Sequence, residues 1–172
     1  IGSAIVDCLI MLRELSGFNI EIYALGRSKD RLEKRFCNYS MCDYIHLIEH
    51  DVCNRLDLDK TIDLVIHTAG NAYPSAFDKY PVDTIMTNIY GTYNLLECCK
   101  KWNTKRFLFV SSGEVYGGSV DTVPVNEEYG SYIDSMNARS CYPNSKRTAE
   151  SLCVSYSKQY GIDTVVVRPC HI

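Results

Sequence analysis

Short apolar runs rich in β-branched residues alternate along the chain with segments whose apolar residues recur at helical spacing. The runs lie at 21–25, 44–49, 62–68, 106–111 and 163–169, and the helical segments at 2–16, 30–39, 81–102 and about 142–160. Strands that are apolar on both faces and alternate with helices are typical of βαβ units, in which helices cover both sides of a parallel sheet. The sequence therefore predicts an α/β fold, a three-layer doubly wound parallel sheet of the Rossmann type with right-handed crossovers.

The two ends of the chain depart from this alternation. Ile1, Gly2 and Ser3 open a helical segment with no strand before it, although a doubly wound sheet normally begins with a strand. Only Cys170, His171 and Ile172 follow the last apolar run. We therefore expect residues 1–172 to form one domain that is incomplete at both ends.

Charge and hydropathy exclude several kinds of partner. The 172 residues include 18 Lys and Arg against 21 Asp and Glu, a formal net charge of −3, and they contain no basic run. We therefore expect no nucleic acid and no anionic membrane as a partner. No apolar stretch approaches the roughly 20 residues that cross a bilayer, and Asp7 and Arg13 interrupt the opening segment. These features indicate a soluble protein of the cytoplasm.

Nine cysteines are spread over the chain, with Cys98 beside Cys99 and no CxxC spacing. Reduced thiols, several of them in the core, account for this pattern better than a disulfide framework. A metal site could be built from His46, His50 and Cys53, but the ligand set is incomplete and His46 lies within a predicted strand. We therefore expect no metal.

Polar residues and glycines directly follow the apolar runs. Doubly wound sheets bind ligands outside the carboxyl ends of their strands, so these residues are the candidates for a site. The segment SSGEVYGG (111–118) follows RFLFV and opens a long irregular stretch at 113–140, and loops of that length in compact domains are usually functional. The expected ligand edge comprises Gly26, Arg27, Ser28, Asp51, Val52, Ala69, Gly70, 111–116 and 169–171.

Tyr142 and Lys146 stand four residues apart at the start of a predicted helix, which places the phenol and the ammonium on one face. A phenol has a pKa near 10, and a nearby cation lowers it, so we expect Lys146 to lower the pKa of Tyr142. Tyr142 could then take a proton from a sugar or alcohol hydroxyl. Alone, this spacing also occurs on ordinary surface helices. Ser112, at the same predicted edge, favours a catalytic role for Tyr142 and Lys146, because it could hydrogen-bond the reacting oxygen.

Several motifs together resemble one family. They are Ser112-x-x-Val115-Tyr116-Gly117, Tyr142-x-x-x-Lys146, Asn88-x-x-Gly91-Thr92-x-Asn94-Leu95-Leu96-Glu97 and Arg168-Pro169. The combination resembles the extended short-chain dehydrogenases/reductases, the NAD-dependent nucleotide-sugar epimerases, dehydratases and decarboxylases. Within that family, the run from Arg139 to Cys153, with Glu128-Tyr129 upstream, is similar to the UDP-glucuronate decarboxylases.

The resemblance implies roles for most residues of the predicted ligand edge. Ser112, Tyr142 and Lys146 would be the catalytic set, with Glu114 as a further catalytic candidate. The implied cofactor-binding residues are Gly2, Arg27, Ser28, Asp51, Val52, Ala69, Gly70, Tyr142, Lys146, Pro169 and His171. Gly2 would be the last glycine of a phosphate-binding turn, and Asp51 and Val52 would flank the adenine. The domain would be an NAD(P)-binding Rossmann fragment at 1–172, without its first strand and the C-terminal substrate-binding part.

Some residues depart from the family pattern. Gly26-Arg27-Ser28 replaces the acidic turn that commonly holds the ribose of NAD, and an Arg can accept a 2′-phosphate, so NAD is expected with NADP as an alternative. Gly113-Glu114 stands where 4,6-dehydratases carry Asp-Glu, which disfavours dehydration. Glu114 could instead fix its loop through backbone N–H groups. His171 occupies the place of an asparagine in many relatives.

The resemblance implies modification of a nucleotide sugar through transient oxidation at C4. A C4 ketone beside a C5 carboxylate is a β-keto acid that loses carbon dioxide readily, so decarboxylation of UDP-glucuronate is the leading hypothesis. The alternatives are a nucleotide-sugar 4-epimerase, a 4,6-dehydratase, and a non-catalytic dinucleotide-binding sensor. The expected partners are a nucleotide-sugar substrate and a second copy of the chain in a homodimer.

Overall fold

The computed structural model describes residues 1–118 and 124–170, and the chain divides into two compact units, Ile1–Asp51 and Val52–Ile172. In the first unit, α1 (Gly2–Ser16) is followed by β1 (Ile22–Gly26), α2 (Lys29–Arg35), a 3-10 turn at Cys37–Tyr39 and β2 (Ile45–Glu49). β1 and β2 pair in parallel, with Ile22 opposite Ile45. Gly17 ends α1 with a φ of 71°, a left-handed conformation that a residue without Cβ adopts readily.

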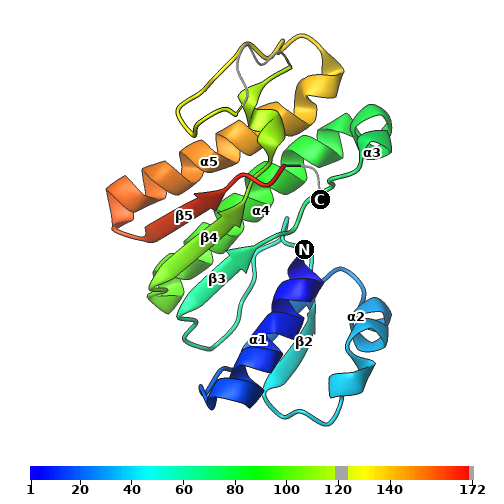
Figure 1. The fold of residues 1–172 in the computed structure, drawn as a ribbon, viewed down its shortest axis with the longest axis vertical. Coiled ribbons are helices and arrows are strands. Elements are labelled where there is room, and N and C mark those ends of the chain that lie inside the picture. The colour runs from blue at the N-terminus through cyan, green and yellow to red at the C-terminus, as the bar shows by residue number, and fades with distance from the viewer. Residues whose placement is uncertain (119–123, 171–172) are drawn as a thin grey trace. The chain divides into compact units, whose positions relative to one another are not determined.

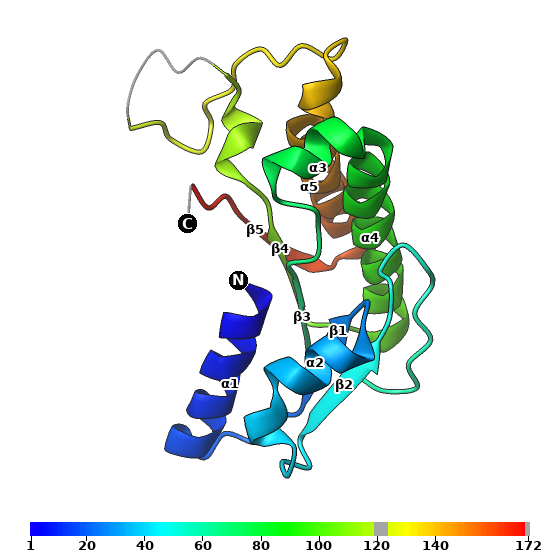
Figure 2. The same cartoon turned by 90° about the vertical axis from the view of Figure 1, so that its right-hand side faces the viewer.

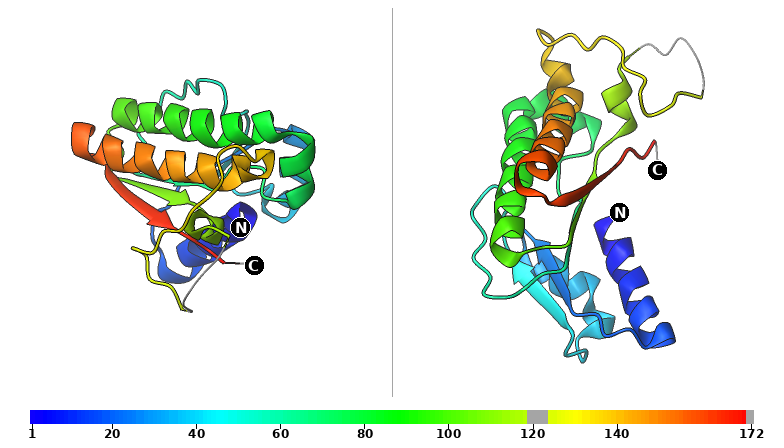
Figure 3. Two further views of the ribbon diagram at one scale, coloured as in Figure 1. Left: turned by 90° about the horizontal axis from the view of Figure 1, so that it is seen from above. Right: turned by 90° about the vertical axis from the view of Figure 1, so that its left-hand side faces the viewer.

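The second unit contains a three-stranded parallel sheet in the order β3-β4-β5. Its elements are β3 (Leu64–His67), α3 (Pro74–Lys79), α4 (Pro81–Trp102), β4 (Arg106–Val110), the 3-10 turns η2 (Gly113–Tyr116) and η3 (Ala138–Ser140), α5 (Cys141–Tyr160) and β5 (Asp163–Val167). Within this unit, Figure 1 shows the three strands side by side. The long helices α4 and α5 lie next to each other along one face of the sheet (Figure 3).

The core of the second unit fills the space between its sheet and these two helices. Phe107 and Phe109 point from β4 into it and are fully buried, as are Leu96 from α4 and Cys153 from α5. Burying one such side chain stabilises a fold by roughly 1.5–3 kcal/mol. This core fixes the position of β4, and therefore of the segment that follows it.

The α/β class with parallel strands is confirmed, and the predicted strands and long helices all form. The pairings β1-β2 and β3-β4-β5 are parallel, as in a doubly wound sheet. The strands pair in two separate sheets among the described residues, where we expected one. The sequence analysis also missed α3, a six-residue helix that begins at Pro74. Figure 2 shows α3 at the end of the second unit where α4 begins.

The segment between η2 and α5 forms a loop that is closed at its base. Ser131 donates two hydrogen bonds to the carbonyl oxygen of Tyr116, from its backbone N at 3.1 Å and from its Oγ at 2.7 Å. Gly117, with a φ of 100°, makes the turn there, and an added Cβ would collide with Ser131. Arg147 of α5 binds both sides of the base, through the carbonyl oxygens of Val115 at 2.8 Å and Ser131 at 2.9 Å.

The nine cysteines are all free thiols, and those at 98, 99, 141 and 153 are buried. Within the described residues, no three His, Cys, Asp or Glu side chains come together in a way that could hold a metal ion. His46 of the predicted ligand set instead contacts Glu21 at 2.8 Å. None of the helices in the described part of the chain combines the length and hydropathy that a membrane span requires.

Candidate active site

Ser112 follows β4 directly and begins the 3-10 turn η2. Its Oγ accepts a hydrogen bond from the backbone N of Glu114 at 3.2 Å, so the hydroxyl caps the turn. The backbone N of Gly113 donates to the carbonyl oxygen of Pro169, which follows β5, at 2.8 Å. These contacts fix the Ser112 hydroxyl at the carboxyl edge of the three-stranded sheet, as predicted.

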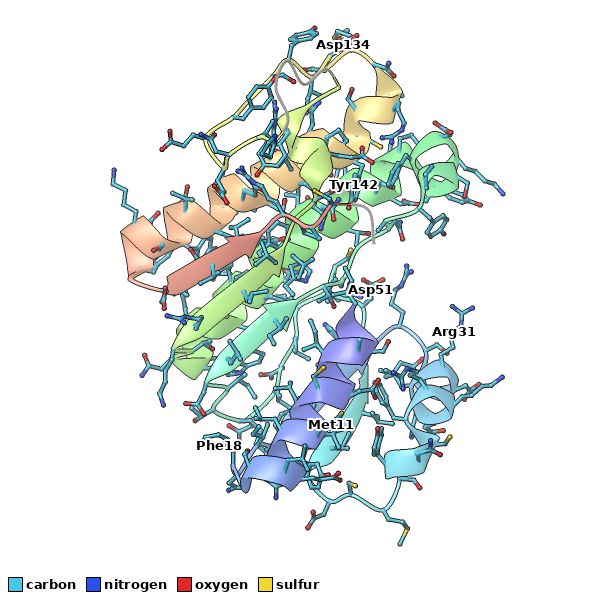
Figure 4. All side chains as sticks on the ribbon, viewed as in Figure 1. Met11, Phe18, Arg31, Asp51, Asp134 and Tyr142 are labelled. Atoms are coloured by element: carbon cyan, nitrogen blue, oxygen red, sulfur yellow. The ribbon has the colours of Figure 1, made fainter. Side chains whose placement is uncertain are left out.

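Tyr142 lies in the first turn of α5, at the place marked in Figure 4. Its ring stacks on Phe77 of α3, with 4.4 Å between ring centroids and 16° between the planes. Its hydroxyl interacts with the Ser112 side chain, which works to lower the pKa of Tyr142. Burial outweighs this hydrogen bond, and the nearby Glu114 charge adds to the effect, so the pKa is raised above its ordinary value.

The predicted lowering of the Tyr142 pKa by Lys146 is therefore wrong. The ammonium of Lys146 lies 5.8 Å from the centroid of the Tyr142 ring, and it donates to the carbonyl oxygen of Val110 at 2.8 Å. Burial of the phenol dominates, which the sequence spacing could not reveal. What favours the phenolate in this structure is the hydrogen bond with Ser112.

Lys146 is nearly inaccessible, with 4% of its surface exposed, and its Nζ also lies 4.7 Å from the centroid of the Phe109 ring. Burial lowers the pKa of Lys146 to about 8, and the charge of Glu150 partly opposes that shift. Glu150 is itself held by Arg168, through contacts of 2.9 and 2.8 Å, and by the Ser111 hydroxyl at 2.6 Å. Lys146 is thus a buried cation with a fixed orientation.

Glu114 forms a two-point ion pair with Arg139 of η3. The guanidinium nitrogens donate to the two carboxylate oxygens at 3.1 and 3.2 Å. Glu114 was predicted as a catalytic residue or as a residue that fixes its loop through backbone N–H groups. The partner that the structure provides for the carboxylate is Arg139, a side chain 25 positions away in the sequence.

Gly70 lies close to two polar side chains of the site. A Cβ added there would be 2.9 Å from Oδ1 of Asn88 and 3.8 Å from Nζ of Lys146, so only glycine fits without displacing Asn88. Asn88 donates from Nδ2 to the Ser145 hydroxyl at 2.9 Å, while its buried Oδ1 has no hydrogen-bond partner among the described residues. Both ring nitrogens of the buried His67 are likewise unpartnered there.

The other predicted cofactor-binding residues are divided between the two units. In the first unit, Gly2 is the first residue of α1, Arg27 is exposed after β1, and Asp51 follows β2. Ser28 caps α2 by accepting a hydrogen bond from the backbone N of Arg31 at 3.4 Å.

In the second unit, Val52 packs against Gly91, and its carbonyl oxygen accepts a hydrogen bond from Asn94 at 2.9 Å. Ala69 follows β3, beside Gly70. His171 lies outside the described residues. The cofactor-binding roles of all these residues remain predictions.

The residues of the second unit fit one end of a dinucleotide. An ammonium carries three N–H donors, and among residues 1–118 and 124–170 the one acceptor for Lys146 is the carbonyl of Val110. The remaining donors suit vicinal ribose hydroxyls, and the unpartnered Oδ1 of Asn88 offers an acceptor nearby. Tyr142 and Ser112 stand at the same edge.

A short-chain dehydrogenase/reductase is the class of protein that this parallel sheet and its Ser112, Tyr142 and Lys146 set define. A family model described as the NAD dependent epimerase/dehydratase family matches residues 1–172, so the chain belongs to that family. The predicted family is thereby confirmed, and with it NAD as the family's cofactor.

Named relatives of the chain are decarboxylases. UDP-glucuronic acid decarboxylase 6 of Arabidopsis thaliana is 35% identical over 168 residues, which are 98% of this chain and 46% of that protein. UDP-glucuronic acid decarboxylase 1 of the same plant is 36% identical over 168 residues, 98% of this chain and 36% of that protein. The chain thus spans less than half the length of these curated relatives.

A solved structure with the same fold is UDP-glucuronic acid 4-epimerase from Bacillus cereus in complex with NAD. The TM-score is 0.74 at 24% identity, and the match covers 99% of this chain and 53% of that chain. At this identity the likeness shows the fold, which agrees with the predicted Rossmann type.

Two residues that shape the site were not predicted as members of it, Phe77 and Arg139. Phe77 lies on the unpredicted helix α3, whose one sequence signal is Pro74 at a first helical position. Arg139 was noted only as part of a motif. Its contact with Glu114 joins the two ends of the loop between η2 and α5, and loop closure of this kind leaves no periodic signal in a sequence.

Proposed function

We propose that the protein removes carbon dioxide from UDP-glucuronate through transient oxidation at C4 of the sugar. The observation that carries the proposal is the meeting of Ser112, Tyr142 and Lys146 at one sheet edge. The relatives named UDP-glucuronic acid decarboxylase support the choice of substrate. Because the chain spans less than half the length of these relatives, the activity is proposed for the whole protein.

In the proposed reaction, Tyr142 takes the proton of the C4 hydroxyl while Ser112 hydrogen-bonds the same oxygen. NAD, when bound, supplies the acceptor for the hydride that leaves C4, and it returns that hydride later. The C4 ketone then lies β to the carboxylate carbon, so the bond from C5 to that carbon breaks, its electron pair moves toward the ketone oxygen, and carbon dioxide leaves. A proton from solvent at C5, the hydride returned to C4 and the Tyr142 proton returned to the C4 oxygen complete a UDP-pentose.

The contact between Glu114 and Arg139 favours decarboxylation over 4,6-dehydration. Dehydration must remove a proton from C5 and protonate a hydroxide leaving C6, which requires both a base and an acid. Gly113 has no side chain to offer, and Glu114 is engaged by Arg139 at both oxygens. Decarboxylation needs no proton removed from C5, and its carbanionic product is stabilised by the ketone of the substrate itself.

Product analysis tests this proposal. The protein is incubated with NAD and either UDP-glucuronate or a neutral nucleotide hexose, and the products are identified by NMR. We expect carbon dioxide and a UDP-pentose from UDP-glucuronate, and no 4-keto-6-deoxy sugar from the hexose. A UDP-sugar inverted at C4 without loss of carbon would replace the proposal by the 4-epimerase alternative. Binding of NAD with no turnover of either sugar would favour the sensor.

We propose NAD rather than NADP as the cofactor used. An enzyme that takes and returns its hydride in each turnover has no need of the reducing pool held as NADPH. Arg27 is exposed after β1, where its guanidinium could contact the 2′-phosphate of NADP. Ser28 beside it caps α2. The role of Arg27 is therefore open to a direct test of cofactor preference.

We also propose that the protein forms a homodimer in which the exposed faces of α4 from the two copies pack against each other. Val82, Met86, Tyr90 and Tyr93 lie within one 80° sector of this 22-residue helix by helical spacing, and all four are exposed. The opposite face of α4 packs against the core of its own unit. An aromatic and apolar stripe of this kind is typical of an isologous interface between two copies of a chain.

The nine free thiols support a cytoplasmic location, because a reducing compartment keeps cysteines in this state.

A further inference from the structure

Arg139 contacts two residues that act on Tyr142: Phe77, which stacks on its ring, and Glu114, whose charge acts on its phenol. Its guanidinium holds the carboxylate of Glu114 at 3.1 and 3.2 Å, and its Cζ lies 4.6 Å from the centroid of the Phe77 ring. Arg139 lies in η3, immediately before α5, so it reaches η2 and α3 from the start of the helix that carries Tyr142. We call Arg139, Glu114 and Phe77 the Arg139 cluster.

Phe77 transmits this arrangement to Tyr142 by packing. It is 1% exposed and stacks on the Tyr142 ring at 4.4 Å between centroids. Its carbonyl oxygen also accepts a hydrogen bond from the Cys141 thiol at 3.7 Å. The aromatic ring therefore has Arg139 and Tyr142 as neighbours within 5 Å of its centroid, and the position of one constrains the position of the other.

Glu114 acts on Tyr142 by charge. Its carboxylate lies near enough to raise the pKa of the phenol, and the guanidinium of Arg139 is the countercharge paired with that carboxylate. The other ionisable groups around this corner are Lys146 and Cys141 on α5 and Asp78 on α3, whose charge acts on Arg139 and Cys141. Arg139 is thus the group that balances Glu114 beside the proposed base.

We propose that Arg139 is a positioning residue for Tyr142: it pairs the Glu114 carboxylate and braces Phe77, so that Tyr142 and not Glu114 exchanges a proton with the substrate. This inference rests on the proposed function for the role of Tyr142 as base. It adds that Glu114 acts as a fixed, neutralised charge and that the proton-transfer step depends on a side chain that does not touch the substrate.

The test follows the ionisation of Tyr142 itself. The full protein is labelled with [13Cζ]tyrosine, the Tyr142 resonance is assigned by its loss in Tyr142→Phe, and its chemical shift is titrated with pH. The variants are Arg139→Met, Arg139→Lys, Glu114→Gln and the double variant Glu114→Gln/Arg139→Met. Arg106→Met is the matched control, because Arg106 pairs with Asp163 at 2.7 Å at the opposite end of the sheet. The pH dependence of kcat/KM is measured in parallel.

In Arg139→Met, the unbalanced carboxylate should move the Tyr142 titration and the acid limb of kcat/KM to higher pH, with kcat/KM at neutral pH lower on the order of tenfold. Arg139→Lys should restore the titration. The double variant should lose the upward displacement, since it lacks the carboxylate. Glu114→Gln alone should move the titration to lower pH, and it tests the charge relationship even if Arg139→Met does not fold.

Three results would overturn the inference. They are an unchanged Tyr142 titration in folded Arg139→Met, an unchanged titration in Glu114→Gln, and a loss of activity in Glu114→Gln as complete as that in Tyr142→Phe. Failure of the proposed function is a separate outcome, because the NMR titration needs no sugar substrate and reports on the Arg139 cluster whichever reaction the protein performs.

Discussion

Lys146 donates from its buried ammonium to the carbonyl oxygen of Val110, the last residue of β4, at 2.8 Å. The contact joins the start of α5 to the end of the central strand of its sheet. It also places a positive charge where only 4% of the side chain is exposed, and a charge in that position has consequences for stability.

We predict that Lys146 makes the protein more stable as the pH rises from about 8 to 10.5. Burial lowers the pKa of Lys146 to about 8, against 10.5 for the unfolded chain, so in this window the unfolded state binds more protons than the folded state. The free energy of unfolding should gain about 3 kcal/mol across it. Urea unfolding at several pH values checks this, and Lys146→Met should remove the gain whereas the exposed control Lys158→Met should keep it.

His67 should make the protein more stable with rising pH in the same way, but in the acid range. Burial, with a smaller contribution from the Lys146 charge, lowers the pKa of His67 to about 3, against 6.5 when unfolded. Its stabilisation is present above pH 6.5 and is lost as the pH falls toward 3, by up to about 5 kcal/mol. His67→Gln should flatten the acid limb of the unfolding free energy, with His46→Gln as the control. Equal flattening in both variants would contradict this assignment.

Substitution of the catalytic set should separate proton transfer from positioning. Tyr142→Phe should abolish turnover of the nucleotide sugar, because it removes the proposed base. Ser112→Ala should reduce kcat on the order of 10²-fold, by the loss of one oriented hydrogen bond in the transition state. Steady-state kinetics measure both, with Tyr160→Phe and Ser151→Ala on the exposed side of α5 as controls. Retention of activity in Tyr142→Phe would remove Tyr142 from the reaction.

Arg27→Ala should reveal whether the turn after β1 selects the cofactor. If Arg27 contacts a 2′-phosphate, the variant should lose affinity for NADP by tenfold or more and keep its affinity for NAD. We expect NAD to bind more tightly than NADP in the unmodified protein, and calorimetry with each dinucleotide measures this order. Tighter binding of NADP would reverse the proposed preference.

The α4 stripe predicts the oligomeric state. Met86→Glu combined with Tyr90→Glu places two charges on the proposed interface, where their burial is costly, so the variant should sediment as a monomer. The unmodified protein and the loop control Tyr132→Glu should sediment as dimers. Analytical ultracentrifugation gives the masses, and a monomeric unmodified protein at micromolar concentration would contradict the prediction.

The regular elements could be predicted because each follows from a local pattern. Residues 81–102 repeat at helical spacing, and RFLFV is apolar on both faces, so their structures follow from their own residues. The pKa of Tyr142 and the side-chain contacts around it could not be predicted in this way. The raised pKa of its phenol depends on burial beneath Phe77, a residue 65 positions earlier on a helix too short to show a period. The pairing of Glu114 with Arg139 depends on the path of the long loop that brings these two distant residues together.

The closed base of that loop lets the sequence of the loop vary without moving the residues of the site. Tyr116 and Ser131 are joined by hydrogen bonds at this base, and Arg147 ties the base to α5, while Glu127 within the loop accepts a hydrogen bond from Arg168 at 2.8 Å. Ser112 and Tyr142 are thus held mainly by contacts outside the exposed part of the loop. Lengthening such a segment costs little, about 0.6 kcal/mol for each doubling. Gly130, where an added Cβ would meet nothing within 4 Å, is therefore a described position of this loop at which sequence divergence or a fluorescent label should leave the proton-transfer geometry unchanged.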